Sequence, residues 1–347
     1  MTMRYRVLGG TGIEVSVHCL GAMMFGKAGN PDHDDSVRII HAALDHGINF
    51  VDTADMYSAG ESETIVGKAL KDRRDDVVLA TKVHFPFGEG PNLGGNSRRW
   101  IVREVEASLK RLQTDWIDLY QIHRPDYTTD VEETLSVLTD LVHQGKIRAF
   151  GSSTFPAADI VDAHHVAERR GLMRFRTEQP PYSLLARGIE KDILPVAARY
   201  NMGVLVWGPL GSGFLTGKYR KGQEADLSTG RPSLTPHRFD PKVPENAAKL
   251  DVVEKLVDVA TDLGCTLPEL AIAFTSSHPA VTSTILGPRT MEQLDSLLKS
   301  AALTLDDATL DRLDEIVPPG TSMYEVGPGH NPAALTKKAL RRPLDER

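Results

Sequence analysis

The sequence predicts a (β/α)8 TIM barrel, and three observations on its 347 residues lead to this fold class. Short apolar runs typical of strands alternate with amphipathic segments typical of helices, which favours a parallel sheet. Eight such units can be counted, and eight units favour closure of the sheet into a barrel over an open sheet. No shift in composition marks a second domain. We therefore expect residues 1–347 to form a single barrel domain.

Two short strand-like runs precede the barrel. Residues 6–8 and 13–16 flank Gly9-Gly10-Thr11-Gly12, a pattern that predicts an N-terminal β-hairpin. Such glycines can also mark a dinucleotide-binding turn. The segment after them is another strand, however, so no helix N-terminus is available there to bind a pyrophosphate.

The barrel strands are recognised as apolar runs of strand length between turn residues. In chain order they are expected at residues 17–25, 49–54, 77–83, 117–123, 147–153, 175–179, 203–207 and 282–286. Helices are predicted from apolar residues at helical spacing, as for Val37, Ile40, Ala43 and Leu44. They are expected at residues 35–46, 61–71, 97–112, 131–144, 157–170, 189–200 and 291–301.

Three segments depart from this alternation. A loop rich in Gly and Pro, residues 84–96, follows strand three and is long enough to have a function. A long loop, residues 208–246, follows strand seven and is rich in Gly, Pro and charged residues. The chain finishes with a helix at residues 306–316 and a polar tail at residues 318–347. We expect the long loop and the tail to form a lid over the C-terminal face of the barrel.

The composition narrows the function classes. The chain is 41% hydrophobic, with a formal net charge of −7 and a pI of about 6.0, which favours neither nucleic acid nor an anionic membrane as a partner. No apolar run approaches the ~20 residues of a membrane span, and residues 1–5 lack the apolar core of a signal peptide. Cys19 and Cys265 are expected as two buried thiols in a reducing cytoplasm.

Polar, ionisable residues end three consecutive strands. Asp52 ends strand two, Lys82 lies near the end of strand three, and His123 ends strand four, while Tyr57 follows Asp52 by five residues. In a parallel barrel, active sites are built from the C-terminal ends of the strands. Strand alternation also places each of the three on the same face as small or apolar residues of its own strand, as expected for the top layer of a barrel interior.

Each of these residues also has a plain structural interpretation. Asp52 could cap a turn, Lys82 could extend from a strand end to solvent, His123 could be a satisfied core histidine, and Tyr57 could pack in a loop. Their joint position at the ends of consecutive strands favours the functional interpretation. A phenol has a pKa near ~10, too high for an efficient proton donor at neutral pH. We expect the lysine ammonium to lower that pKa, the aspartate to fix the lysine, and the imidazole to orient a carbonyl oxygen.

The chain resembles the aldo-keto reductase family along nearly its whole length. The resemblance is carried by long motifs in the family's order: residues 47–54 with Tyr57, 80–83, 117–123, and 145–148 running into 151–155. The segment Leu210-Gly211-Ser212-Gly213-Phe214-Leu215-Thr216-Gly217-Lys218-Tyr219, after Trp207-Gly208-Pro209, resembles the branch related to potassium-channel β subunits.

The resemblance implies a barrel that binds NADPH without a Rossmann fold. It carries over Asp52, Tyr57, Lys82 and His123 as a catalytic tetrad in which Tyr57 is the acid. It implies cofactor contacts from Ser153, Thr154 and Gln179 at the nicotinamide carboxamide, Trp207 on the nicotinamide ring, Gly208, Leu210, Ser212 and Lys218 along the loop at the pyrophosphate, and Gly287, Arg289 and Gln293 at the adenosine end.

Two positions depart from the family pattern. Thr154 replaces a usual Asn, although its hydroxyl could still bond the carboxamide. Ser296-Leu297 stands where the family often has a Glu-Asn pair, which puts the adenine contacts in doubt.

We therefore expect a cytoplasmic enzyme that reduces a small aldehyde or ketone with NADPH. A dehydrogenase running in reverse, and a cofactor-sensing regulatory subunit with little turnover, remain alternatives. The oligomeric state is open, with a homo-oligomer possible. No metal is expected: Asp32-His33-Asp34-Asp35 and His164-His165 are assigned to solvated helix faces, and Arg98 and Arg99 to surface charge.

Overall fold

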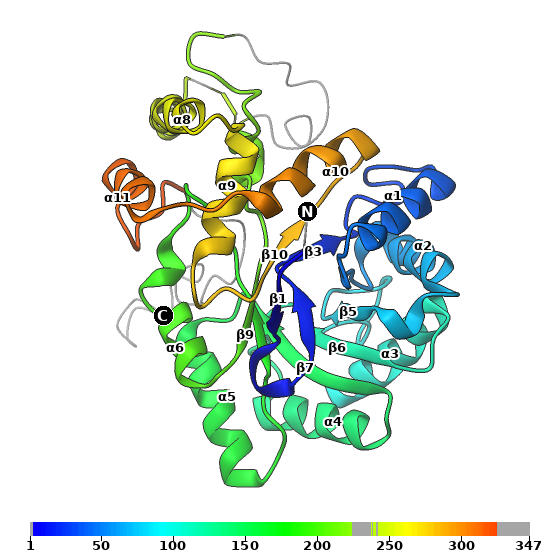
Figure 1. The fold of residues 1–347 in the computed structure, drawn as a ribbon. Coiled ribbons are helices and arrows are strands. Elements are labelled where there is room, and N and C mark those ends of the chain that lie inside the picture. The colour runs from blue at the N-terminus through cyan, green and yellow to red at the C-terminus, as the bar shows by residue number, and fades with distance from the viewer. Residues whose placement is uncertain (1–2, 224–236, 238, 241, 325–347) are drawn as a thin grey trace.

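The computed structural model describes residues 3–223, 237, 239–240 and 242–324 (Figure 1). It contains a closed barrel of eight parallel strands surrounded by helices, so the predicted fold class is confirmed. Within these residues, none of the helices has the length and apolar character needed to cross a membrane. The single-domain assignment of residues 1–347 stays a prediction.

The barrel strands are hydrogen-bonded in chain order, and the last pairs with the first. They are β3 (His18–Gly21), β4 (Phe50–Asp52), β5 (Val78–Val83), β6 (Ile117–Ile122), β7 (Ile147–Ser153), β8 (Thr177–Gln179), β9 (Gly203–Val206) and β10 (Ser283–Leu286). The strands lie where the sequence predicted them, although β3, β4 and β8 are shorter than the runs at 17–25, 49–54 and 175–179.

Side-chain alternation along the strands fills the barrel. An interior cluster contains Phe50 of β4, Ala80 of β5, Leu119 of β6 and Leu205 of β9. Phe50 and Ala80 lie two positions before Asp52 and Lys82, and Leu119 lies four positions before His123, on the same faces of their strands. The register confirms the pairing, because Asp52 lies beside Ala80 and Lys82 beside Gln121. The polar residues therefore form the layer above an apolar floor.

A two-stranded antiparallel hairpin closes the N-terminal end of the barrel, as predicted. It consists of β1 (Tyr5–Val7) and β2 (Glu14–Ser16) and is drawn in blue at the centre of Figure 1. Leu8 and Val15 of the hairpin belong to the interior cluster. The hairpin thus plugs the end of the barrel opposite to the polar layer, and access is left to the C-terminal end.

Helices pack around the strands and bury a second, larger apolar layer. They are α1 (His33–Asp45), α2 (Glu61–Leu70), α3 (Arg98–Leu112), α4 (Val131–His143), α5 (Ala157–Arg170), α6 (Ile193–Arg199), α8 (Pro244–Asp262), α9 (Leu267–Ser277), α10 (Met291–Leu298) and α11 (Asp307–Ile316). Polar residues begin several of them: the side chains of Asp32, Ser97 and Asp130 accept backbone N–H groups of the first turns of α1, α3 and α4.

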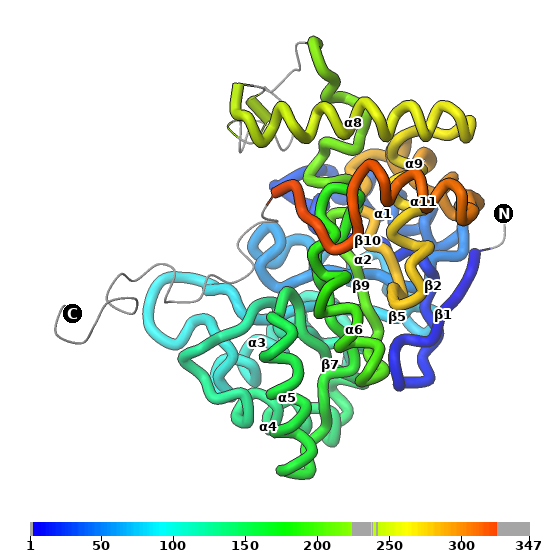
Figure 2. The backbone as a smooth tube through the Cα atoms, turned by 90° about the vertical axis from the view of Figure 1, so that its left-hand side faces the viewer, coloured from blue at the N-terminus to red at the C-terminus, as the bar shows by residue number. Residues whose placement is uncertain are grey.

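Sequence reasoning assigned no element between residues 246 and 282, where the structure has α8 and α9. α8 begins at Pro244, inside the segment that had been expected to be a loop, and lies across one end of the molecule (Figure 2). α9 lies against the strands and is almost entirely buried. Thr266 and Glu269 form a reciprocal capping box at its start, a sequence signal that could have located it.

The predicted lid is only partly within the described residues. From the long loop, residues 208–223 pass over the C-terminal end of the barrel and include a short 3-10 segment, Gly211–Thr216. Residues 318–324 pair with the loop after β8, where Met323 N–H donates to Leu185. Residues 224–236 of the long loop and 325–347 of the tail lie outside the described residues.

Candidate active site

Two polar side chains from neighbouring strands, Asp52 and Lys82, meet Tyr57 of the loop after β4 at the C-terminal end of the barrel. The Lys82 ammonium donates to Asp52 Oδ1 at 2.5 Å, to the Thr53 carbonyl oxygen at 2.8 Å and to the Tyr57 hydroxyl at 3.2 Å. Lys82 is fully buried and Asp52 nearly so. Burial lowers the pKa of Lys82, but Asp52 and Tyr57 raise it further, so its pKa is above the usual value and the lysine is charged.

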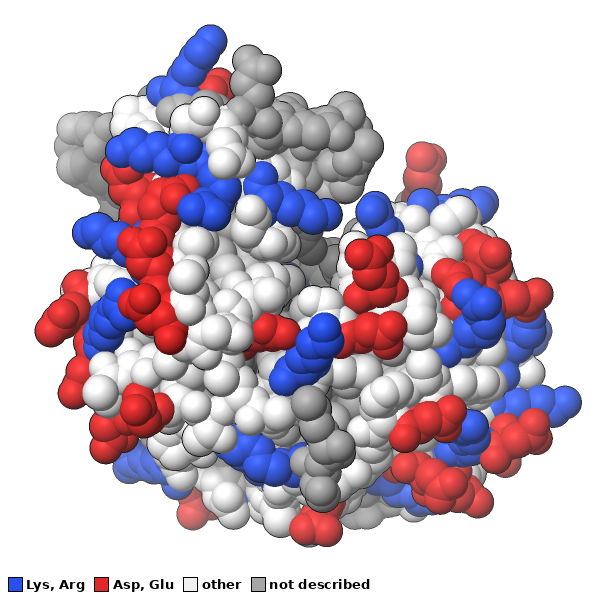
Figure 3. All heavy atoms as spheres, turned by 45° about the horizontal axis from the view of Figure 1, so that its top comes forward, with Lys and Arg blue, Asp and Glu red and all other residues white. Residues whose placement is uncertain are grey.

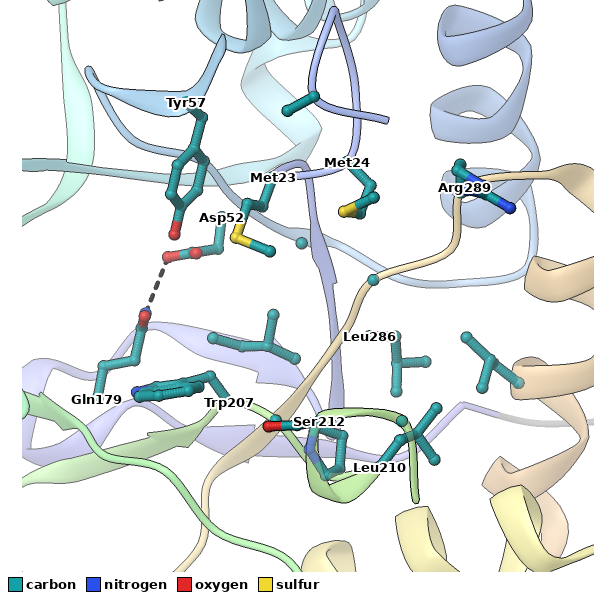
Figure 4. A pocket seen from close by; sticks show the side chains of 18 of the residues that line it. Met23, Met24, Asp52, Tyr57, Gln179, Trp207, Leu210, Ser212, Leu286 and Arg289 are labelled. Atoms are coloured by element: carbon teal, nitrogen blue, oxygen red, sulfur yellow. Dashed lines mark hydrogen bonds between the residues drawn. The ribbon is translucent and has the colours of Figure 1, made fainter. Parts of the chain in front are cut away.

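The second carboxylate oxygen of Asp52 is also satisfied. Gln121 Nε2 donates to Asp52 Oδ2 at 3.1 Å and Gln179 Nε2 donates to it at 2.9 Å; the bond from Gln179 is visible in Figure 4. A buried carboxylate with an ammonium and two amides as donors is fully compensated. Asp52 therefore fixes the position of Lys82 and keeps its ammonium group beside the Tyr57 hydroxyl.

The backbone after Tyr57 turns sharply. Ser58, Ala59 and Gly60 all have left-handed φ values of 48°, 56° and 87°. Two consecutive non-glycine residues in this region are costly. The Tyr57 hydroxyl lies over the strand ends, where it points toward Asp52 and Gln179 in Figure 4.

The sequence predicted a lowered pKa for Tyr57, and this is wrong. Burial of the phenol raises its pKa, and the opposing effect of the Lys82 ammonium does not overcome this. The residue holds its proton at neutral pH. It is a hydrogen-bond donor beside a cation, and its conjugate base would be stabilised by that cation once formed.

His123 completes the polar layer. Its ring lies edge-on to Tyr57, with centroids 5.8 Å apart, and edge-on to Phe85 at 4.9 Å. Burial, together with Lys82 and Arg124, lowers the pKa of His123 well below its usual value. The imidazole is therefore neutral, able to donate from one nitrogen to an oxygen in the cavity.

A cavity of about 830 Å³ opens above this layer, within the size range of ~300–1,000 Å³ typical of ligand sites. It is long, with Tyr57 near one end and Arg289 near the other, and with Trp207, Ser212 and Leu210 along one side (Figure 4). Charged side chains of both signs are interspersed on the face shown in Figure 3, with Lys and Arg at the upper edge of a hollow.

The cavity brings together most of the residues singled out from the sequence. Its lining includes Asp52, Tyr57, His123, Ser153, Gln179, Trp207, Gly208, Leu210, Ser212, Lys218, Gly287, Arg289 and Gln293. Lys82 lies behind Asp52 and Tyr57 and is buried. Thr154 is not among the lining residues, and its hydroxyl lies 3.5 Å from that of Ser153.

The model of the family described as "Aldo/keto reductase family" matches residues 19–318 of the chain. The chain belongs to the aldo/keto reductase family. It is 40% identical to the uncharacterized oxidoreductase YrpG of Bacillus subtilis over 91% of this chain and 96% of that protein. It is 38% identical to a Schizosaccharomyces pombe protein named "putative voltage-gated potassium channel subunit beta", over 90% of this chain and 93% of that protein. It is 36% identical to the aldo-keto reductase YhdN of Bacillus subtilis, over 94% of this chain and 97% of that protein.

The structure adds residues to this site that the sequence did not point to. Gln121 bonds Asp52, and Arg124, Ile272 and Thr216 line the cavity. Gln121 could have been found, because it shares a strand face with His123 and adjoins Lys82 in the register. Ile272 could not, since its helix had not been assigned.

Other candidates from the sequence fall outside the cavity. Among the described residues, no group of three or more His, Cys, Asp or Glu side chains is placed to hold a metal ion. The assignment of His164 to a solvated face is wrong: it is buried and stacks on Tyr200, with ring centroids 4.2 Å apart. Arg98 pairs with Asp140 at 2.7 Å on the surface. Cys19 is buried, Cys265 partly so, and both are free thiols.

Proposed function

We propose that the protein reduces an aldehyde or ketone to an alcohol with NADPH, with Tyr57 as the proton donor. The observation that carries the proposal is the Tyr57 hydroxyl at 3.2 Å from the Lys82 ammonium, at the base of a long cavity. When bound, NADPH supplies a hydride to the carbonyl carbon. Tyr57 donates a proton to the carbonyl oxygen as negative charge develops there, and the neutral His123 orients that oxygen by a hydrogen bond.

The lining of the cavity fits an extended dinucleotide. Trp207 is partly exposed to the cavity, and its backbone is fixed by hydrogen bonds with Pro180 and Tyr182. Its ring would stack on the nicotinamide, next to Ser153 and Gln179. Because Gln179 Nε2 already donates to Asp52, the oxygen of its amide is the atom left for the carboxamide of the cofactor.

The adenosine end of the cavity is apolar where the family often has polar residues. Leu297, Ile272 and Leu286 form a buried cluster with Leu210 against it, and all four line the cavity. The adenine would therefore be held by contact with aliphatic side chains, without the usual polar pair. Without a polar pair to hydrogen-bond the edge of the adenine, the site would bind the base with less specificity.

Arg289 favours NADPH over NADH. Its guanidinium has no carboxylate partner among the described residues, and it lines the cavity. Its backbone N–H donates to Gln293 Oε1 at 2.8 Å. The guanidinium, rather than this N–H group, is thus the donor that would meet a 2′-phosphate.

Two further activities belong to the same site. The reverse reaction, oxidation of an alcohol with NADP⁺, uses the same groups. A cofactor-sensing regulatory subunit is the second candidate, favoured by the channel-subunit names of several relatives. We also propose a cytoplasmic location, a small carbonyl compound as the partner, no nucleic acid or membrane partner, and a possible homo-oligomer.

The test is turnover measured beside binding. NADPH oxidation is followed with a panel of aldehydes and ketones, and NADP⁺ reduction with the matching alcohols, while cofactor binding is followed by quenching of tryptophan fluorescence. Turnover with several carbonyl compounds supports the reductase. Tight binding of NADPH with no turnover across the panel would favour the regulatory subunit.

A further inference from the structure

An arginine stands at the catalytic end of the cavity without a role in the proposed chemistry. Arg124 follows His123 directly and lines the cavity together with His123 and Tyr57. Its guanidinium carbon lies 5.7 Å from the centre of the Phe85 ring, and its Nη1 donates to the His123 carbonyl oxygen at 2.5 Å. The guanidinium is thereby held next to the place where a carbonyl substrate would react.

The charge of Arg124 is not neutralised by the part of the chain that the structure describes. Three other arginines with little exposure each hold a carboxylate: Arg74 pairs with Asp118 at 2.7 Å, Arg111 with Glu63 at 2.6 Å, and Arg187 with Glu190 at 2.8 Å. Arg6, which has no carboxylate among the described residues, donates instead to the backbone carbonyl oxygens of Ser276 and Val281. No described carboxylate lies within ion-pair distance of Arg124, and its Nε is buried with no hydrogen-bond partner among these residues.

Two acidic side chains of the same region, Asp126 and Glu178, are hydrogen-bonded elsewhere, although Glu178 acts on Arg124 electrostatically without an ion pair. Asp126, two residues further on, accepts from the backbone N–H groups of Asn96 and Thr128, both at 2.9 Å, and from the hydroxyl of Thr129. Glu178 is fully buried and accepts from the Ser152 hydroxyl and from Phe155 N–H. Neither can turn to Arg124 without giving up these bonds.

A half-buried guanidinium without a counter-ion is unfavourable, and burial lowers the pKa of Arg124 accordingly. An anion from a ligand would relieve this cost and could bind in bidentate fashion. The phosphates of the proposed cofactor are served by Arg289 and Lys218. Arg289 lies at the far end of the cavity from Tyr57 (Figure 4), so the anion at Arg124 must come from the substrate.

We propose that the preferred substrates are carbonyl compounds that carry a carboxylate or phosphate close to the reacting carbonyl, and that Arg124 binds this anion. The inference rests on the proposed reductase function and names the substrate class for the same site. Arg124 is a specificity-determining residue in this scheme, since it would touch the anion and not the reacting atoms.

The experiment compares matched anionic and neutral aldehydes. 3-Formylbenzoate and 4-formylbenzoate are each paired with their methyl esters, which have no charge and a more electrophilic carbonyl, so that a preference for the anion cannot come from intrinsic reactivity; glyceraldehyde 3-phosphate is paired with glyceraldehyde. The first pairs test for a carboxylate and the second for a phosphate. We expect kcat/KM to favour the anion in at least one pair by roughly 10–100-fold, as for a hydrogen-bonded charge pair, and the preference to fall as ionic strength rises.

The same pairs are then measured with Arg124→Met and with a control, Arg148→Met. Arg148 also lies over an aromatic ring, 5.6 Å from the centre of Trp116, but is exposed and not among the residues that line the cavity. We expect Arg124→Met to lose most of the anion preference while the esters change little, and Arg148→Met to keep it. Arg124→Lys keeps a charge without the planar fork, and part of the preference should survive.

Three outcomes would overturn the inference. The first is a wild-type protein that reduces both members of every pair equally well. The second is a preference for the anion that persists in Arg124→Met. The third is an equal loss of kcat/KM for anionic and neutral substrates in that variant, which would assign Arg124 to the positioning of His123 or Tyr57. The first needs no variant, so a misfolded Arg124→Met cannot hide it. Absence of turnover with every aldehyde would instead contradict the proposed reductase function, and the inference with it.

Discussion

The Lys82 ammonium lies 3.2 Å from the Tyr57 hydroxyl oxygen, while its charge is held by Asp52 on its other side. This relationship joins a strand end to a loop residue 25 positions earlier. It gives the phenol a fixed, buried cation that stabilises its conjugate base. The functional proposals and several of the predictions below depend on it.

Lys82→Met should remove both the cation and the partner of Asp52. We expect a large loss of kcat, because the phenolate is no longer stabilised, and a loss of stability of about 3–5 kcal/mol, because a buried carboxylate is left unpaired. The double variant Asp52→Asn, Lys82→Met separates the two effects: it should recover much of the stability and none of the activity. Stability is measured by denaturant unfolding and kcat on folded protein. Recovery of activity in the double variant would contradict the role given to Lys82.

Arg289→Ala should weaken the binding of NADPH alone. The 2′-phosphate is the group in which the two cofactors differ, and the guanidinium is the donor available to it. We expect the wild type to bind NADPH more tightly than NADH, and the variant to lose most of that difference, roughly 10–100-fold for a charged hydrogen bond. Titrations of both cofactors into both proteins test this. Equal wild-type affinities, or a variant that loses NADH equally, would show that the assignment is wrong.

Thr154→Asn should stabilise the protein. Thr154 has a left-handed φ of 58°, a conformation that is unfavourable for a β-branched residue and better tolerated by Asn. We expect a gain of about 1 kcal/mol in the free energy of unfolding. Thr154→Val serves as the control, since it keeps the branching and removes the hydroxyl. A gain of the same size in the control would mean that backbone strain is not the cause.

Asp55→Asn should stabilise the protein increasingly as pH rises. Burial, with Glu63 and Glu104 nearby, raises the pKa of Asp55 from 3.8 to about 8. Because the pKa of Asp55 is higher in the folded than in the unfolded protein, the wild type loses stability as pH rises from the unfolded value to the folded one. The loss is up to ~1.4 kcal/mol per pH unit. Asn keeps an oxygen to accept from Met56 N–H and has no charge to lose. Unfolding at pH 5 and pH 8 tests this; an advantage independent of pH would contradict it.

The strand ends could be predicted from the sequence because two periodicities fix them. Alternation within a strand places Lys82 above Ala80 and Asp52 above Phe50, and parallel pairing brings the strand ends together. The unpredicted features depend on tertiary contacts. The left-handed run at Ser58 and Ala59 and the burial that raises the pKa of Tyr57 are not revealed by the sequence.

The missed helices and the misplaced histidine have different causes. α9 is buried on almost all sides, and its polar residues lie at its two ends, so its central part lacks the polar face that periodicity detects. His164 lies on the face of α5 that packs toward Met202, with Nε2 3.3 Å from the sulfur, and the charged residues around it in sequence suggested a solvated face. The sequence does not single out Arg124, because an arginine after a strand end is ordinarily solvated.

The central claim is that Tyr57 donates the proton. Tyr57→Phe removes one oxygen atom and leaves the ring, so NADPH should bind with nearly unchanged affinity. Loss of a general acid costs typically 10²–10⁴-fold. The most direct measurement is therefore kcat of Tyr57→Phe beside its NADPH affinity. We expect kcat to fall by at least about 100-fold with binding intact; a variant that keeps more than about a tenth of wild-type kcat, a difference of only ~1.4 kcal/mol, would contradict the account.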